Sequence, residues 1–124
     1  MDGLKQMIQS GDWKGEKHVP VIHAPEKITS DTLTEIKISI GDAIKHPNTL
    51  EHHIAWFKLF YLPATGKFPI ELGTYEFRAH GEGNAFTEPC VSTNVKLQTS
   101  GILYALSYCN LHGLWESSKE IVIE

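Results

Sequence analysis

Hydrophobic and polar residues alternate at a period of two through much of the chain. Ile36, Ile38 and Ile40 alternate with polar side chains, which is typical of a strand with one buried and one wet face. Similar runs separated by turn residues predict strands at 19–22, 74–80, 91–99, 102–108 and 120–123. Only residues 4–9 predict a short helix, which Ser10-Gly11-Asp12 ends. About seven short strands without a long amphipathic helix predict an all-β fold, an antiparallel β-sandwich of immunoglobulin-like type.

The segment 54–62 differs from the other predicted strands because it is apolar on both faces. In a strand, Trp56 and Phe60 would face one side of the sheet, whereas Phe57, Leu59 and Tyr61 would face the other. A strand of this kind lies at the centre of a sheet or beneath a neighbouring subunit. The pattern therefore points to a homo-oligomer.

Length and composition narrow the possible classes of protein. A chain of 124 residues is large enough for one domain with its own core, so we expect a single domain over residues 1–124. Met1 to Ile8 carries no long apolar run, which argues against a signal peptide or a membrane span. We expect a cytoplasmic protein with Cys90 and Cys109 as free thiols, Cys90 being buried at the start of a strand. The net charge of −4 and the dispersed lysines provide no surface for nucleic acid.

Nitrogen and sulfur donors fall at strand ends or in connections, where a rigid sandwich can bring distant residues around one ion. They are His18, His46, the adjacent pair His52 and His53, and the pair Cys109 and His112. One thiolate and several imidazoles suit iron, copper or zinc better than calcium or magnesium. Structural zinc closes at about four ligands and favours more cysteine. Five donors, counting one residue of the adjacent histidine pair, instead suggest an octahedral ion with one open position, which is typical of a catalytic site.

The local patterns differ in how strongly they indicate a metal. Cys109-x-x-His112 is the strongest, because a two-residue spacer lets both side chains converge on one ion, although such a pair also occurs without a metal. Adjacent side chains of an extended segment point to opposite faces, so only one of His52 and His53 easily reaches a common ion. Spacing alone does not choose between them.

Other polar residues have ordinary structural explanations when each is considered alone. Glu16 and Lys17, beside His18, are interpreted by themselves as a solvated ion pair. His23 and His80 belong to no partner motif, and we expect both to be structural or surface residues.

Three motifs together resemble the superoxide reductase family, which includes neelaredoxin and desulfoferrodoxin. The motifs are residues 11–20, residues 46–53 with His-Pro-Asn followed by Glu-His-His, and residues 104–116, so they extend over nearly the whole chain. The resemblance implies one non-haem iron per subunit, with four histidines in a plane, a cysteine thiolate below it and an open position for superoxide. It assigns the metal ligands as His18, His46, His52, His112 and Cys109, and so favours His52 over His53.

The resemblance also implies an activity and partners. The family reduces superoxide by one electron to hydrogen peroxide and is re-reduced by an external donor such as rubredoxin. Glu16 matches a glutamate that is a further metal ligand in the oxidised state, and Lys17 matches a catalytic lysine that lies over the open position in the reduced state. The family resemblance implies a homotetramer. No cysteine precedes Cys90, so we expect no N-terminal desulforedoxin-like domain.

Two other classes of protein share parts of this pattern. A cupredoxin-like electron carrier is also a sandwich with histidines and a cysteine, but it usually has an axial methionine soon after that loop. The only methionines here are Met1 and Met7. The second alternative is a non-catalytic metal-binding sandwich domain. The identity of the bound metal and the colour of the oxidised protein distinguish these classes.

Overall fold

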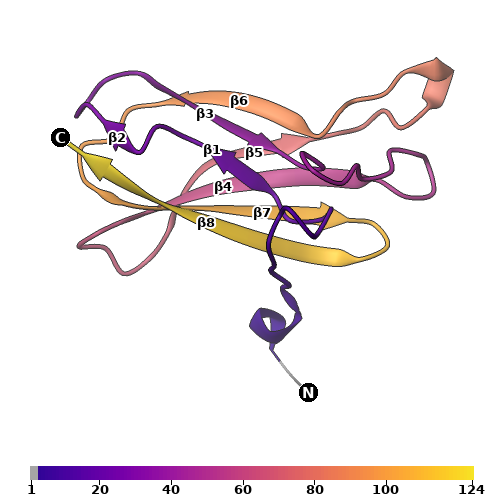
Figure 1. Ribbon diagram of the computed structural model, residues 1–124, viewed down its shortest axis with the longest axis horizontal. Coiled ribbons are helices and arrows are strands. Elements are labelled where there is room, and N and C mark those ends of the chain that lie inside the picture. The colour runs from indigo at the N-terminus through magenta and orange to yellow at the C-terminus, as the bar shows by residue number, and fades with distance from the viewer. Residues whose placement is uncertain (1–2) are drawn as a thin grey trace.

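Two β-sheets pack face to face in the computed structural model, which describes residues 3–124 (Figure 1). The smaller sheet has the order β1-β3-β6 and the larger the order β2-β8-β7-β4-β5. All strand pairs are antiparallel except β2 with β8. Met1 and Asp2 lie outside the described residues. They begin the segment 1–8, whose sequence argues against a signal peptide. Within residues 3–124, no helix combines the length and apolarity that a membrane crossing requires.

The strand bounds follow the chain in order, with two short 3₁₀ turns. The strands are β1 (Val21–His23), β2 (Lys27–Ile28), β3 (Thr34–Ser39), β4 (Ile54–Pro63), β5 (Ile70–Glu76), β6 (Cys90–Val95), β7 (Gly101–Cys109) and β8 (Gly113–Ile123). The 3₁₀ turns are η1 (Leu4–Met7) and η2 (Glu82–Asn84). The segment that carries η1 projects away from the sandwich (Figure 1). The prediction of an all-β sandwich is confirmed.

Strand β4 has the two-sided apolar pattern that the sequence predicts. Phe57, Leu59 and Tyr61 point into the core between the sheets and are buried. Trp56 and Phe60 point to the outer face of the five-stranded sheet and are half-buried. Since β4 lies between β7 and β5, its backbone is paired on both sides and it is a central strand, as predicted.

The observed strands differ from the predicted ranges mainly where a strand has polar or exposed faces. The predicted strand 74–80 instead spans Ile70–Glu76, because β5 is an edge strand whose Ile70 and Glu71 are exposed and give little alternation. The predicted strand 120–123 begins at Gly113, because β8 pairs with β7 along its polar stretch as well. The helix expected at 4–9 is only one 3₁₀ turn, and Cys90 is exposed rather than buried because it begins the outer strand β6.

Candidate metal centre

Four imidazole rings form a closed quadrilateral at one end of the sandwich. Strands β3 and β7 end there and β4 and β8 begin there (Figure 1). Neighbouring ring centroids are 4.8 Å apart for His18 and His46, and 4.7 Å apart for His46 and His52. The circuit closes through His112, which is 5.0 Å from His52 and 4.8 Å from His18. The diagonal from His18 to His52 is longer, at 6.2 Å. This arrangement places four nitrogen donors around one centre.

A cysteine sulfur lies at the buried side of this ring. Cys109 is fully buried, and its Sγ is 3.5 Å from His46 Nε2 and 3.8 Å from His112 Nδ1. The donor atoms of four residues all lie within 4.8 Å of one another; the four are His18, His46, His52 and Cys109. His112 is exposed, so the ring faces solvent on one side and the core on the other. The five residues therefore bring four nitrogens and one buried sulfur together.

Hydrogen bonds on the outer nitrogens orient two of the rings. His18 Nδ1–H donates to the Glu16 carboxylate at 2.6 Å, and His46 Nδ1–H donates to the Pro47 carbonyl at 2.6 Å. Each bond fixes the proton on Nδ1 and turns an unprotonated Nε2 toward the centre of the ring. Outer partners of this kind are what hold the rings of metal-bound histidines in place.

The other two rings complete the set of donors. His112 turns its Nδ1 inward, 3.1 Å from His18 Nε2. His52 Nε2 is buried and has no hydrogen-bond partner among the described residues. A buried polar atom without a partner is costly in a folded protein, and a metal ion at the centre of the ring would supply the missing partner. Three Nε2 atoms, one Nδ1 atom and one thiolate fit iron, copper or zinc.

The electrostatics of the ring favour neutral imidazoles, which are the form that binds metal. Burial lowers the pKa of His46 to about 4, and the charges of neighbouring groups act in the same direction. Burial also lowers the pKa of His52, with His112 and His18 contributing. Both rings are therefore uncharged at neutral pH.

The metal-free protein is expected to lose stability as the pH falls from about 7 to about 4. His46 has its ordinary pKa of 6.5 in the unfolded chain and about 4 in the fold, so the unfolded chain binds more protons throughout that interval. The lowered pKa of His52 acts with the same sign. Thermal unfolding of the metal-free protein across this range measures the effect. His46→Gln should make the dependence shallower, and an equally steep dependence in that variant would contradict the assignment to His46.

Tight turns at two glycines shape the connections that carry the donors. Cys109 is the last residue of β7, and the turn back to β8 passes through His112 to Gly113, whose φ of +81° favours glycine. Gly41, with a φ of +75°, begins the β3–β4 connection, and a side chain there would meet the His46 backbone nitrogen at 3.0 Å. Both turns bring a donor close to the sheet end.

Several side chains behind the ring fix its backbone. Ser107 Oγ donates to the His18 carbonyl at 3.0 Å. The Trp115 indole stacks on the His18 ring at 4.9 Å, and its Nε1–H donates to the His112 carbonyl at 3.2 Å. Gln9 Nε2 donates to the same carbonyl at 3.1 Å. The sequence did not predict these roles for Gln9, Ser107 and Trp115, because nothing in local spacing links the three residues to a histidine.

Glu16 and Lys17 lie beside the ring but not among its inward donors. The Glu16 carboxylate accepts the His18 Nδ1–H and the His18 backbone N–H, so in this arrangement it orients the His18 ring. Partial burial opposes ionisation of Glu16, but the two hydrogen bonds from His18 outweigh it and lower the pKa of the carboxyl. Lys17 is half-buried, and its charge contributes, after burial and the imidazoles, to the lowered pKa of His46 and His52.

The remaining histidines lie outside the ring. The structure includes His52 in the ring, whereas His53 stacks on His80 with centroids 3.5 Å apart. His23 pairs with Asp42, with its Nε2 3.1 Å from a carboxylate oxygen. The adjacent pair therefore separates as the opposite faces of an extended segment require.

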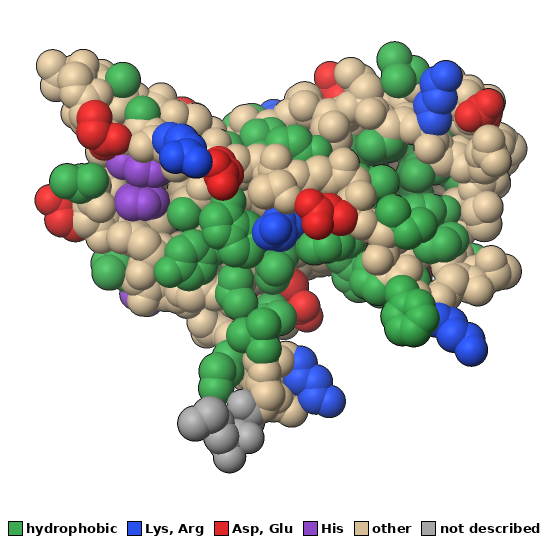
Figure 2. All heavy atoms as spheres, turned by 180° about the vertical axis from the view of Figure 1, so that it is seen from behind, with side chains coloured by type: hydrophobic (Ala, Val, Ile, Leu, Met, Phe, Trp, Pro, Cys, Tyr) green, Lys and Arg blue, Asp and Glu red, His purple; other side chains and the backbone are tan. Residues whose placement is uncertain are grey.

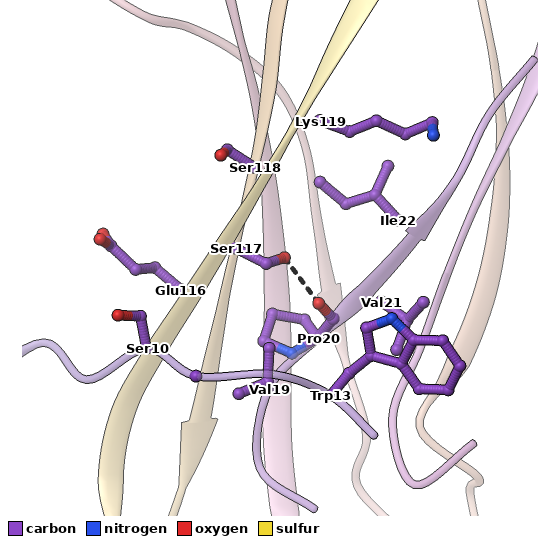
Figure 3. A pocket seen from close by; sticks show the side chains of 11 residues that line it. Ser10, Trp13, Val19, Pro20, Val21, Ile22, Glu116, Ser117, Ser118 and Lys119 are labelled. Atoms are coloured by element: carbon purple, nitrogen blue, oxygen red, sulfur yellow. Dashed lines mark hydrogen bonds between the residues drawn. The ribbon is translucent and has the colours of Figure 1, made fainter. Parts of the chain in front are cut away.

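A separate groove of about 550 Å³ lies between the N-terminal segment, β1 and β8, and none of the five donor residues lines it (Figure 3). Trp13 forms one wall of this groove. Ser117 Oγ donates to the Pro20 carbonyl at 2.6 Å, which ties the segment after His18 to β8 (Figure 3).

Comparison with known proteins identifies the family. The desulfoferrodoxin family model matches residues 10–118. The chain belongs to the desulfoferrodoxin family. Among its relatives in this family, a superoxide reductase of Pyrococcus horikoshii is 50% identical, with 95% of this chain and 98% of the relative covered. A neelaredoxin of Megalodesulfovibrio gigas is 43% identical, with 95% and 96% covered.

A solved structure supports the desulfoferrodoxin fold directly. The superoxide reductase (neelaredoxin) of Archaeoglobus fulgidus in the reduced form superposes with a TM-score of 0.86 at 42% identity, covering 94% of this chain and 98% of that one. The family resemblance predicted from the three motifs is therefore confirmed. The family and the donor set together imply non-haem iron.

Proposed function

We propose that this protein is a superoxide reductase, which reduces superoxide by one electron to hydrogen peroxide at a single iron in each subunit. The observation that carries the proposal is the ring of four imidazoles closed on its buried side by Cys109, in a chain of the desulfoferrodoxin family. The ligands would be His18, His46, His52, His112 and Cys109. When bound, iron supplies a one-electron Fe²⁺/Fe³⁺ couple and an open coordination position.

Residues around the iron would have separate roles in the reaction. The buried Cys109 thiolate would donate electron density to the metal from the core side, as thiolates do in haem enzymes. The exposed His112 side leaves access for a small anion and for the protons that complete hydrogen peroxide. Glu16 would release His18 and become a further ligand in the oxidised state, as the family resemblance implies. A cupredoxin-like carrier or a non-catalytic domain has no corresponding support.

Lys17 would act as the catalytic residue that attracts superoxide. The chain is acidic overall, so an ammonium beside the ring makes a local positive region in a protein that would otherwise repel an anion. Electrostatic attraction of this kind raises association rates by about 10-fold to 1,000-fold and weakens as salt screens it.

Lys17→Ala is expected to slow the capture of superoxide about 10-fold and to make the rate less dependent on ionic strength. Pulse radiolysis of the reduced, iron-loaded protein at several salt concentrations measures both effects. Lys14→Ala is the matched control, because Lys14 is an exposed lysine of the same segment and should leave the rate nearly unchanged. A salt dependence in Lys17→Ala equal to that of the native protein would refute the role in attraction.

Re-reduction would need an external donor. Each superoxide takes one electron and two protons to form hydrogen peroxide, and no step of that reaction returns the electron. We propose a rubredoxin-type protein as the donor and a cytoplasmic location, which suits the two free thiols. With reduced rubredoxin and superoxide supplied, we expect one rubredoxin oxidised and one hydrogen peroxide formed for each superoxide. Release of molecular oxygen with half that yield would indicate a dismutase instead.

The outer face of the five-stranded sheet supports a homo-oligomer. Half-buried apolar side chains on β4 and β7 point outward there; they are Trp56, Phe60, Leu62, Tyr104, Leu106 and Tyr108. Ile8 of the projecting N-terminal segment lines a hollow of about 270 Å³ on this face, together with Phe60 and Tyr104. Figure 2 shows hydrophobic side chains gathered on the surface where that segment leaves the sandwich. We propose that other copies of this chain cover this face, and that the assembly is the tetramer that the family resemblance implies.

Phe60→Glu is expected to shift the protein to a smaller species, because it places a charge in the centre of the proposed interface. Size-exclusion chromatography with light scattering measures the mass. Leu33→Glu is the control, since Leu33 is 64% exposed and directly precedes β3, which belongs to the three-stranded sheet. It therefore lies away from the proposed interface. A monomeric native protein would contradict the proposed assembly.

A further inference from the structure

His80 is a buried histidine that lies outside the metal ring and in a different part of the chain. It follows β5 on the connection to η2 and is only 6% exposed. Its side chain contacts two residues of the β3–β4 connection, Asn48 and His53. That connection carries His46 and His52, two of the proposed metal ligands.

Both ring nitrogens of His80 face an oxygen acceptor. The Nε2 atom is 2.7 Å from the Phe77 carbonyl, which accepts only, so Nε2 carries a proton. The Nδ1 atom is 2.7 Å from Asn48 Oδ1. The amide of Asn48 has this orientation because its Nδ2 donates to the Thr87 carbonyl at 3.1 Å. Turning the amide over would set its oxygen against that carbonyl, so the network keeps the Asn48 amide oxygen toward His80.

Further contacts hold the His80 ring in place. Glu82 accepts the His80 backbone N–H at 2.9 Å. His53 stacks on His80 with an interplanar angle of 7°. The His53 Nδ1–H donates to the Thr49 carbonyl at 2.9 Å, which orients the His53 ring against His80.

These contacts fix both ends of the ligand-bearing connection. Asn48 is two residues after His46, and His53 directly follows His52. We propose that His80 is a positioning residue for the metal centre, which sets the spacing between His46 and His52 through Asn48 and the His53 ring. The inference rests on the proposed metal site and adds a residue that does not touch the metal.

The affinity for Fe²⁺, measured anaerobically by competition with a chelator, tests this role. His80→Phe retains an aromatic ring for the stack but removes both hydrogen bonds, and we expect it to bind Fe²⁺ about 10-fold to 100-fold more weakly, as loss of an outer partner does. Asn48→Leu should cause a similar loss. Because the two residues act through one hydrogen bond, the double variant should be little weaker than either single variant.

Arg78→Gln is the matched control, because Arg78 is a nearby residue of the same connection that is exposed and pairs only with Glu76 among the described residues. It should bind Fe²⁺ like the native protein. Full affinity in a folded His80→Phe variant, or losses that simply add in the double variant, would overturn the proposal. If the native protein itself bound no Fe²⁺, the proposed function would fail instead.

A measurement on the unaltered, metal-free protein covers the case in which these variants do not fold. Nitrogen-15 NMR of the imidazole side chains should show a hydrogen bond between His80 Nδ1 and the Asn48 side chain. Absence of that hydrogen bond would contradict the positioning of Asn48 by His80.

Discussion

Cys109→Ser is expected to remove the superoxide reductase activity by more than about 100-fold, beyond the loss typical of an outer partner. The sulfur is the one soft donor in the ring, lies fully buried, and is within 3.5 Å of His46 Nε2. A serine hydroxyl is shorter and harder, and it does not ionise near neutral pH, so it cannot replace a thiolate as an iron ligand. The oxidised variant should also lose the thiolate-to-iron absorption band.

Cys90→Ser is the matched control for this substitution. Cys90 is the other free cysteine and is exposed at the start of β6, so its replacement should leave iron content, colour and activity unchanged. Thermal unfolding of the metal-free variants separates a loss of metal from a loss of fold. Retention of the absorption band in Cys109→Ser, or its loss in Cys90→Ser, would contradict the assignment of the thiolate.

His52→Gln is expected to weaken Fe²⁺ binding by more than about 100-fold, because it removes a donor rather than an outer partner. The buried Nε2 of His52 has no hydrogen-bond partner among residues 3–124, so its lone pair is available to bind a metal ion. His53→Gln, one residue later, removes the stack on His80 and the hydrogen bond to the Thr49 carbonyl but no donor to the metal, and should cost no more than about 10-fold to 100-fold.

The order of these two affinities is the decisive result. Chelator competition on the pair compares adjacent residues of the same type in the same connection, so general effects on the fold are closely matched. If His53→Gln bound Fe²⁺ more weakly than His52→Gln, the assignment of the ring would be wrong.

The sequence predicted those parts of the fold in which burial alternates strongly. Strands β4 and β7 were expected close to their observed bounds, because their inward residues, such as Phe57 and Leu103, alternate with outward ones. The range of β5 was displaced and most of β8 was missed. Edge exposure in β5 and the polar outer face of β8 remove the alternation that sequence reasoning depends on.

The candidate site could be predicted only in part from local spacing. Cys109 and His112 stand out because a tight turn joins them, but the choice between His52 and His53 needed the family resemblance. The contacts of His80 with Asn48 and His53 had no signal in the sequence, because they join segments about 30 residues apart through tertiary packing. Outer partners of a metal site are set by the fold rather than by spacing along the chain.

The central claim is tested most directly by adding superoxide to the anaerobically reduced, iron-loaded protein without a donor. The visible spectrum and the hydrogen peroxide formed are followed together. A thiolate-to-iron charge-transfer band that grows in step with one hydrogen peroxide per iron and then stops is the predicted result. No band, or continued turnover without a donor, would contradict a superoxide reductase with a Cys109-ligated iron.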